Sequence, residues 1–451
     1  MPRALTFEYV LTPAGLQRSC RVSCDDAGRI LAVEPGVRDR PERGLALPGM
    51  PNAHSHVFQR AIVGRGEGSS QDSFWSWRAV MYRVANAIDA EDLHAIALRG
   101  FADMLCAGYT SVGEFHYVHH RRDGARGAEM VLAVRAAARA TGIRLVLLPV
   151  LYQLGGFGLG GSGRDPAPDQ MRFVHRSLDE FGRLLEALRD EPCGIAPHSL
   201  RAVALRTLPD VVALADSVLG REAPIHIHVS EQQREVDECR ATHGRPPIEC
   251  LADTIELGPR WSLVHATHAV SAELDVMARR DPNLVLCPLT EAYLGDGLFP
   301  LEALARARNA DAPFAVGSDS NVRIDAIEEL RLAEYGQRLQ HQRRTALRGA
   351  QDIGVTLWNR TAERGARSLA QPVGVLEPGR FADITVLDLD DPLFEGLPAQ
   401  NVLDAWLTAG SAAQIATVYV GGERRVERGE VVAVPGLERF AGVMQRIHEK
   451  R

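Results

Sequence analysis

The chain has 451 residues, of which 45% are hydrophobic and 24% are charged, and its formal net charge is −7. This length exceeds that of one small domain but accommodates one large barrel with an accessory domain. The composition is that of an ordinary soluble globular protein, and the negative charge argues against a nucleic-acid or anionic-membrane surface. Any site for an anion must therefore be local and built from a few arginines.

The cysteines and the N-terminus indicate the cellular compartment. The seven cysteines are scattered, odd in number and without CxxC spacing, which is typical of reduced thiols. The first residues contain no apolar core long enough for a signal peptide, and no run of roughly 18 apolar residues occurs. We therefore predict a cytoplasmic protein without a membrane span.

The first 48 residues contain short alternating stretches separated by Gly, Pro and Asp, which predicts a few antiparallel strands. Beyond them, apolar runs alternate with helix-period segments, as in βα units on a parallel sheet. Eight strands are predicted there: Ala46–Met50, Tyr109–Glu114, Ile143–Leu151, Gly194–His198, Pro224–Val229, Ser262–Ala266, Leu284–Pro288 and Phe314–Ser318. The predicted helices are Glu91–Ala107, Glu129–Thr141, Met171–Arg189, Leu208–Leu219, Pro247–Leu257, Ala272–Arg279 and Ala326–Gln340.

Eight strand–helix units predict an α/β fold with a (β/α)8 TIM-type barrel. An open doubly wound sheet is the alternative, but no GxGxxG follows an early strand. Strand patterns return near residue 380, at Asp383–Leu389, Val402–Thr408, Ile415–Val420, Glu423–Val426 and Val431–Val434. We predict that residues 1–48 and 370–451 form a small β-sandwich domain, and that residues 49–369 form the barrel.

Two insertions interrupt the barrel pattern. Residues 59–90 carry an aromatic cluster with one cation, Phe74-Trp-Ser-Trp-Arg78. Residues 153–168 are rich in glycine but lack the Gly-Lys-Ser/Thr of a phosphate-binding loop. We interpret the second insertion as a flexible active-site loop or lid, with a surface excursion as the alternative.

Histidines gather at the predicted carboxyl ends of the strands, where active sites of such barrels lie. Alternation along a strand points His54 and His56 to the same side. Six of the 15 histidines occupy such ends, and they are His54, His56, His198, His228, His265 and His268. Glu231 follows His228 closely, and Asp319 ends the eighth strand. Single buried histidines are usually core residues, but this set favours a metal site.

The residue types indicate the chemistry of that site. Imidazoles with one carboxylate suit Zn²⁺ or Fe²⁺, and we expect no cysteine to compete. Three histidines and an aspartate leave room for a water whose pKa the metal lowers. Glu231 can then carry protons instead of binding metal. The pattern therefore predicts a hydrolytic site with a metal-bound hydroxide.

These segments carry a family resemblance. His54-Ser-His56, His228-Val-Ser-Glu231, His265 and Ser318-Asp319 resemble the amidohydrolase superfamily, in particular its mononuclear deaminase branch. Binuclear members carry a lysine at the end of the fourth strand, where this chain has His198, so the resemblance implies one metal ion. Phe74-Trp-Ser-Trp-Arg78 and Glu114-Phe-His-Tyr-Val-His-His120 resemble the members that act on N-formimino-L-glutamate.

The resemblance implies a role for each site residue. The metal, one Zn²⁺ per subunit with Fe²⁺ as the alternative, would be bound by His54, His56, His228 and Asp319. Glu231, His265 and Asp319 would be catalytic, with Glu231 passing the proton of the water to the leaving nitrogen. The substrate would be held by Gln59, Arg78, Tyr117, His198 and Arg201. A homodimer acting on a small dianionic amidine is implied, without nucleic-acid or membrane partners.

Several alternatives stay open at this point. His226 is expected in the core, His268 competes with His265, and Arg78 could instead stack on Trp75 or Trp77. The same machinery could deaminate an aromatic base or nucleoside such as guanine or adenosine, which would need ring-stacking and amide contacts instead of two arginines. A metal-binding scaffold without catalysis is the third hypothesis, against which Glu231 and His265 count.

Overall fold

The structure, a computed structural model, describes residues 3–38, 41–66, 74–158, 163–344, 346–347 and 352–449. Eight parallel strands form two four-stranded sheets, β5-β6-β7-β8 and β12-β11-β10-β9. Their bounds are β5 Met50–Ser55, β6 Tyr109–His116, β7 Arg144–Leu151, β8 Ala196–Pro197, β9 Ile225–Val229, β10 Trp261–His265, β11 Asn283–Leu286 and β12 Ala315–Val316. Parallel bridges from Ile195 to Ile225 and from Ser55 to Asp319 join the two sheets, so the barrel is closed. The predicted TIM-type fold is confirmed.

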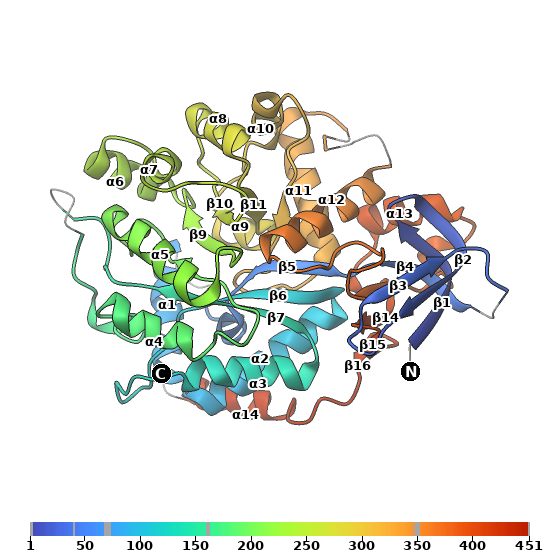
Figure 1. Ribbon diagram of the computed structural model, residues 1–451, viewed down its shortest axis with the longest axis horizontal. Coiled ribbons are helices and arrows are strands. Elements are labelled where there is room, and N and C mark those ends of the chain that lie inside the picture. Colours follow the sequence, from blue (N-terminus) through green and yellow to red (C-terminus); the bar gives the residue numbers. More distant parts are fainter. Residues whose placement is uncertain are drawn as a thin grey trace.

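Helices surround the barrel strands (Figure 1). They are α1 Phe74–Ala87, α2 Ala90–Cys106, α3 Glu129–Thr141, α4 Leu178–Glu186, α5 Leu208–Leu219, α6 Gln233–His243, α7 Pro247–Thr254, α8 Ser271–Arg280, α9 Pro288–Leu294, α10 Leu301–Arg308, α11 Ala326–His341 and α12 Ile353–Ser368. Two have their predicted bounds, α3 and α5. The helix predicted from Met171 begins only at Leu178, because the Ser177 hydroxyl accepts the Glu180 amide at 3.2 Å and caps the helix there.

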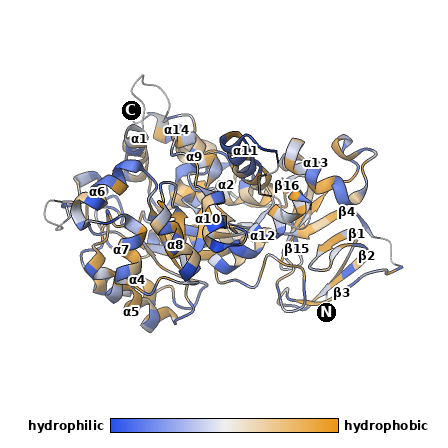
Figure 2. Ribbon diagram, turned by 90° about the horizontal axis from the view of Figure 1, so that it is seen from above, coloured by the Kyte–Doolittle hydropathy of each residue, from blue (hydrophilic) through white to orange (hydrophobic). Residues whose placement is uncertain are grey.

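Strands from both ends of the chain pair in one eight-stranded sheet beside the barrel (Figure 2). They are β1 Arg3–Thr12, β2 Gly15–Cys24, β3 Ile30–Glu34, β4 Glu42–Pro48, β13 Ile384–Leu387, β14 Ile415–Val420, β15 Glu423–Glu427 and β16 Glu430–Val431. The N-terminal and C-terminal strands meet where β4 pairs with β13. Helix α14, Arg439–Glu449, then returns to the barrel and packs against α2. The predicted domain boundaries, at residues 48/49 and 369/370, stay a prediction.

Two predicted strands are wrong, and a third, Val431–Val434, forms a strand only at Val431, the last residue of β16. Val402–Thr408 is helix α13, Val402–Ala409, whose buried residues Val402, Leu403, Trp406 and Leu407 follow helical spacing. The predicted first barrel strand, Ala46–Met50, lies mostly in β4 of the terminal sheet, and the barrel strand proper is β5.

The chain passes from one sheet to the other at Gly49. Its amide donates to the Asp383 carbonyl of the terminal sheet, and the next amide, of Met50, donates to the Gly108 carbonyl beside the barrel. A Cβ on Gly49 would lie 2.3 Å from the Thr110 side chain, so only glycine fits this crossing. The apolar run therefore belongs to the first sheet, and the polar residues that follow it continue as a barrel strand.

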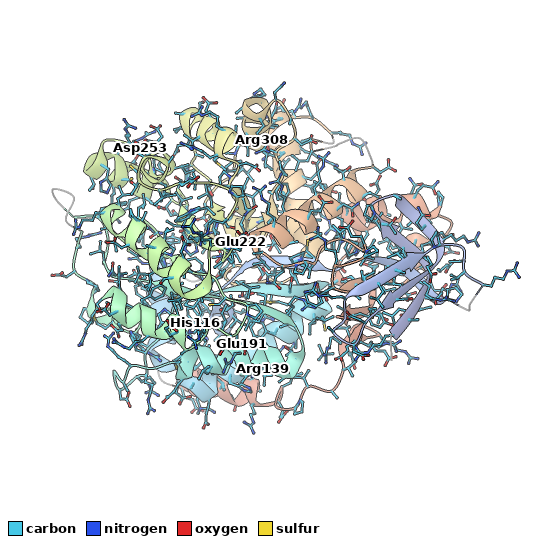
Figure 3. All side chains as sticks on the ribbon, viewed as in Figure 1. His116, Arg139, Glu191, Glu222, Asp253 and Arg308 are labelled. Atoms are coloured by element: carbon cyan, nitrogen blue, oxygen red, sulfur yellow. The ribbon has the colours of Figure 1, made fainter. Side chains whose placement is uncertain are left out.

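Charged side chains occupy the outside of the helical layer. Figure 3 shows Arg139 and Glu191 close together there, and they form an ion pair. His116, by contrast, is buried. Among the described residues, no helix is both long and apolar enough to cross a bilayer.

Candidate active site

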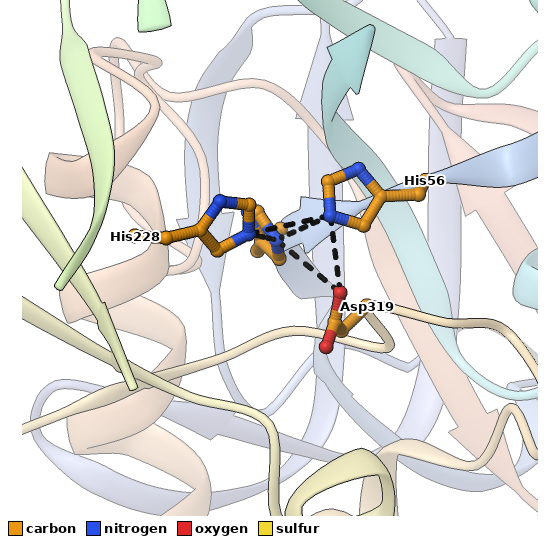
Figure 4. A group of neighbouring side chains, drawn as sticks. His56, His228 and Asp319 are labelled. Atoms are coloured by element: carbon orange, nitrogen blue, oxygen red, sulfur yellow. Dashed lines mark hydrogen bonds and ion pairs between the residues drawn. The ribbon is translucent and has the colours of Figure 1, made fainter. Parts of the chain in front are cut away.

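Four side chains meet at the carboxyl ends of the barrel strands, as Figure 4 shows with His56, His228 and Asp319 labelled. His54 lies in β5, His56 directly after it, His228 in β9, and Asp319 beyond β12. The three Nε2 atoms lie 3.1 Å (His54–His56), 3.3 Å (His56–His228) and 3.0 Å (His54–His228) apart. Asp319 Oδ1 lies 3.4 Å from Nε2 of His54 and 3.2 Å from that of His56. All four side chains are buried.

The second nitrogen of two rings shows which way the lone pairs face. Nδ1 of His56 lies 2.9 Å from the Phe115 carbonyl, and Nδ1 of His228 lies 3.2 Å from the His198 carbonyl. A carbonyl only accepts, so each Nδ1 donates and each Nε2 presents a lone pair to the cluster. Ligands at about 2.0–2.1 Å in a tetrahedron are about 3.3 Å apart. The cluster therefore fits a divalent metal ion.

The charge states of His54 and Asp319 also agree with metal binding. Burial lowers the pKa of His54 to about 3, so its imidazole is neutral near pH 7. Burial alone would raise the pKa of Asp319, but contacts with His54 and His56 hold it well below its usual value. Neutral imidazoles and an ionised carboxylate are the forms in which these side chains bind metals.

A hydrogen-bond network fixes the backbone of the ligands across the seam between β5 and β12. The Asp319 amide donates to the His54 carbonyl at 3.0 Å, and the His56 amide donates to the Asp319 carbonyl at 2.9 Å. Asn52 Oδ1 accepts the Ser318 amide at 3.0 Å, and Asn321 Nδ2 donates to the Asp319 carbonyl at 2.9 Å. The two asparagines support the backbone of the candidate ligands, a role that sequence reasoning missed although both flank those residues in the chain.

Backbone strain is concentrated at the same strand ends. Ser230, His265, Ala266 and Asp319 have positive φ angles of 51°, 68°, 52° and 43°. Side chains other than glycine rarely adopt this region unless the surroundings enforce it, and such residues cluster at functional sites. The strain therefore marks the ends of β9, β10 and β12 as the part of the barrel arranged for chemistry.

Glu231 and His265 lie beside the four clustered side chains. His265 Nε2 lies 3.9 Å from Glu231 Oε1 and 3.8 Å from Asp319 Oδ2, while its Nδ1 lies 3.2 Å from Glu291 Oε1. Burial alone would lower the pKa of His265, but the hydrogen bond to Glu291 and the charges of Glu231 and Asp319 raise it to about 10. A protonated His265 therefore points its Nε2 at both carboxylates. Sequence reasoning missed Glu291, which orients the ring.

The competing histidines lie elsewhere. His226 shares a face of β9 with His228 but lies one layer deeper, where its Nε2 contacts the Ser368 carbonyl at 2.8 Å, and its ring is buried. His268 does not belong to the group of ligand atoms. The structure thus brings His265, and not these two, to the four ligands.

The expectation that no cysteine would compete is wrong in one respect. Cys287, at the end of β11, is buried and lies with His265 and Asp319 in a second group of possible ligand atoms. Sequence reasoning overlooked it because β11 contributes no histidine. Burial raises the pKa of the Cys287 thiol well above its usual value, with nearby carboxylates adding to the effect. The group of His54, His56, His228 and Asp319 offers one more ligand atom than this second group, so it remains the better site.

A cavity of about 420 Å³ extends from the cluster, and all five predicted substrate-binding residues line it together with His56, His228, Asp319 and Glu231. Arg201 is buried, with Nη2 lying 3.3 Å from Glu231 Oε2. Its Nη1 has no hydrogen-bond partner among the described residues. Gln59 donates to the Tyr117 hydroxyl at 2.8 Å, while the amide oxygen of Gln59 is likewise unpartnered within the described ranges. These free polar atoms are suited to a polar ligand.

Arg78 is held by aromatic rings. Its guanidinium lies 4.6 Å from the Trp75 centroid and 5.3 Å from that of Tyr82, and both rings line the cavity. Arg78 therefore stacks on aromatic rings and lines the cavity at the same time. In the described part of the chain, no carboxylate lies within ion-pairing distance of Arg78, so its charge is available to a ligand.

The glycine-rich insertion reaches the same cavity. Gly155, Gly156, Arg164 and Asp165 line it, and Gly156 pairs with Arg164 as a short antiparallel bridge. Residues 159–162, at the tip of the predicted lid, lie outside the described residues. Lid movement therefore stays a prediction.

A family model described as "Amidohydrolase family" matches residues 45–425 of the chain. The chain belongs to the amidohydrolase family. This match spans the barrel, the four clustered side chains and strands β13 and β14 of the terminal sheet, and members of this family depend on bound metal.

Individual relatives show which members of the family the chain resembles. The chain is 42% identical to formimidoylglutamate deiminase of Pseudomonas aeruginosa, covering 94% of this amidohydrolase and 95% of that protein. A 5'-deoxyadenosine deaminase of Methanothermobacter thermautotrophicus is 26% identical, over 95% of this chain and 93% of its own. The crystal structure of an amidohydrolase from Brucella melitensis has a TM-score of 0.89 at 38% identity, covering 99% of this chain and 100% of that one.

A more distant solved structure shares the fold. It is an adenosine deaminase from Xanthomonas campestris with bound zinc, with a TM-score of 0.80 at 23% identity, covering 99% of this chain and 98% of that one.

Proposed function

We propose that this amidohydrolase hydrolyses N-formimino-L-glutamate to N-formyl-L-glutamate and ammonia. The observation that carries the proposal is the pair of arginines in the cavity, Arg78 without a carboxylate partner among the described residues and Arg201 with an unpartnered Nη1. N-formimino-L-glutamate is an amidine with two carboxylates, and an acidic protein needs placed cations to bind such a dianion. The likeness to formimidoylglutamate deiminase supports the same substrate.

The metal centre in this proposal is a single Zn²⁺ held by His54, His56, His228 and Asp319. Its chemical contribution is to lower the pKa of a bound water and to polarise the reacting group. The zinc-containing solved relative and the three-imidazole set support zinc, and Fe²⁺ is the alternative that the same donors accept. The homodimer and the cytoplasmic location stay predictions.

Glu231 and His265 have different roles in this proposal. We assign Glu231 to take a proton from the attacking water and to deliver it to the amidine nitrogen, since its carboxylate lies on the cavity beside Asp319. Water adds to the formimino carbon, the C–N bond breaks, and the nitrogen leaves as ammonia, which leaves the formyl group on glutamate. His265, protonated and 3.8 Å from Asp319 Oδ2, orients the water and stabilises its deprotonation.

The glutamyl part of the substrate is assigned to the arginine end of the cavity. A guanidinium presents a planar fork that matches a carboxylate, so Arg78 and Arg201 can each bind one of the two. Gln59 and Tyr117 already form a pair at 2.8 Å, and His198 lies near Tyr117, with ring centroids 5.8 Å apart. These neutral groups would complete the hydrogen bonding.

Ammonia release from a substrate panel tests the function. The protein, reconstituted with Zn²⁺, is given N-formimino-L-glutamate, guanine, adenosine, 5'-deoxyadenosine and cytosine at equal concentrations. We expect fastest release from N-formimino-L-glutamate. Much faster release from a base or nucleoside would overturn the assignment in favour of an aromatic deaminase. Absence of release from all five would favour the scaffold hypothesis.

A further inference from the structure

Glu235 is a buried carboxylate at the edge of the candidate active site to which no role has been assigned above. It lies in the first turn of α6, four residues after Glu231, and is 1% exposed. Its Oε2 accepts the backbone amide of Glu231 at 3.2 Å and lies 4.0 Å from Nη2 of Arg201. One carboxylate thus contacts both the residue assigned to carry protons and a residue assigned to bind the substrate.

The Arg201 guanidinium faces two ways. Nη2 points to the carboxylates of Glu231 and Glu235, at 3.3 and 4.0 Å, while Nη1 has no partner in the described part of the chain. A guanidinium is planar and rigid, so fixing the direction of Nη2 also fixes that of Nη1. Glu235 therefore helps to decide where the free end of Arg201 points.

Electrostatics reinforces this geometry. Burial alone would lower the pKa of Arg201, but the charges of Glu235 and Glu231, in that order, raise it. Glu235 and Glu231 together thus stabilise the buried cation. A neutral side chain at position 235 would leave Glu231 as the one charged carboxylate within 4.0 Å of Arg201 among the described residues, which would draw Arg201 and Glu231 closer together.

The backbone of Glu231 needs support at this point. The preceding residue, Ser230, has a φ of 51°, a conformation that side chains other than glycine adopt only when contacts enforce it. The hydrogen bond from the Glu231 amide to Glu235 is one such contact. It fixes the position of the Glu231 backbone and therefore the direction in which the Glu231 side chain leaves the end of β9.

We propose that Glu235 is a positioning residue that holds Arg201 and Glu231 in fixed relation, so that carboxylate binding and proton transfer depend on each other. The inference rests on the proposed function, because it uses the roles assigned there to Arg201 and Glu231. It predicts that the loss of the Glu235 charge impairs both steps although Glu235 touches neither substrate nor metal.

The test compares Glu235→Gln with Glu273→Gln. Glu273 is a matched control, since it is also buried and accepts two backbone amides, those of Ile248 at 2.7 Å and Val270 at 3.0 Å, but does not line the cavity. We expect kcat/KM for N-formimino-L-glutamate to fall about 10- to 100-fold in Glu235→Gln, the range known for residues that orient catalytic groups. Glu273→Gln should stay within about twofold of the parent, and metal content should be unchanged in both.

A double-mutant cycle with Arg201→Met supplies a measurement that a purely structural role would not move. If Glu235 acts through Arg201, the rise in KM in the double variant equals that of Arg201→Met alone within about twofold. Calorimetric binding of N-formyl-L-glutamate gives the same comparison without turnover. Losses that multiply, or parent-like kinetics in Glu235→Gln, would overturn the proposal.

A shorter acid provides a second variant should Glu235→Gln fail to fold. Glu235→Asp keeps the charge but moves it back by one methylene. We expect a smaller fall in kcat/KM than in Glu235→Gln, and again no additional rise in KM when it is combined with Arg201→Met. Failure of the proposed function would appear in the parent protein, as no ammonia from N-formimino-L-glutamate. Failure of this inference would appear only in the variants, as additive losses on whichever substrate the parent hydrolyses.

Discussion

The two ends of the cavity are built differently. At the proposed metal end, the candidate ligands lie on or just beyond strands β5, β9 and β12, and backbone hydrogen bonds across the barrel seam join His54, His56 and Asp319. At the arginine end, Arg78 comes from the helical insertion α1 and is stacked on Trp75, and the glycine-rich insertion adds Arg164. The first end is part of the barrel, whereas the second combines Arg201, from the loop after strand β8, with side chains that the two insertions add.

This difference separates chemistry from specificity. Relatives named as deaminases of nucleosides share the length of the chain at 26–28% identity, as expected if the metal end is common to them. Insertions can change without disturbing the strand ends, so they are the natural place for substrate selection. Variants at the metal end should therefore abolish catalysis, whereas variants at the arginine end should weaken substrate binding.

The largest effect is expected from His228→Ala, which removes one imidazole donor from the metal end. Metal content, measured by mass spectrometry, should fall and turnover should be lost, because two imidazoles and one carboxylate hold the ion less tightly. His226→Ala is the matched control on the same strand, since its Nε2 contacts only the Ser368 region. Equal metal loss in both variants would show that strand β9, and not ligation, was disturbed.

Glu231→Gln should reduce kcat by about 10²- to 10⁴-fold while the metal stays bound. The amide keeps the shape of the side chain but cannot carry a proton. Steady-state kinetics together with metal analysis measure both quantities. Parent-like kcat in this variant would remove Glu231 from the proton path.

Arg201→Met should act on the other end. Hydrogen bonds to charged groups contribute about 1.5–3 kcal/mol, which corresponds to a rise in KM of about 10- to 100-fold for the dianionic substrate. Part of the loss would also reach kcat, because Arg201 contacts Glu231 at 3.3 Å. An unchanged KM would remove Arg201 from the substrate pocket.

Trp75→Leu should have a smaller effect on the same end. The stacked ring orients Arg78, and Arg234 of α6 also lies 4.5 Å from its centroid. A cation–π contact contributes about 0.5–1 kcal/mol at a partly exposed site, so we expect KM to rise about two- to fivefold with little change in kcat. Trp75→Phe should recover most of the loss, and a fall in kcat alone would contradict the positioning role.

The smallest kinetic effect is expected from Glu273→Gln, far from both ends. Burial raises the pKa of Glu273 to about 6, so the folded chain retains a proton that the unfolded chain releases. The free energy of unfolding therefore falls as the pH rises from the unfolded pKa of about 4.5 to about 6. Denaturant titrations at pH 4.5 and pH 7 measure the free energy of unfolding. Its fall between these two pH values should be smaller in Glu273→Gln than in the parent protein. An unchanged pH dependence would contradict it.

Much of the fold could be predicted because local patterns carry it. Apolar runs alternating with helix-period segments predicted the barrel, and seven of the eight predicted strands lie on or beside the barrel strands that form. Period-two alternation placed His54 and His56 on one side, and the ends of the strands brought them to His228 and Asp319. Resemblance to a family then suggested what each might do.

Local patterns failed where a distant partner decides. Ala46–Met50 was read as one strand, but a close approach to Thr110 and hydrogen bonds to Asp383 and Gly108 divide it between two sheets at Gly49. Val402–Thr408 reads equally as a strand or a helix by composition, and burial on one helical face decides it.

The sequence by itself determined the barrel, the ligand types and the side of the barrel on which they meet, because periodicity and chain order suffice for these. Only the tertiary structure decided which ring nitrogen of His56 faces the cluster and that Glu291 orients His265. It also decided that Cys287 lies close to His265 and Asp319, and that Glu235 contacts both Arg201 and Glu231. Each depends on contacts between segments far apart in the chain. Such contacts leave no local periodicity from which they could be predicted.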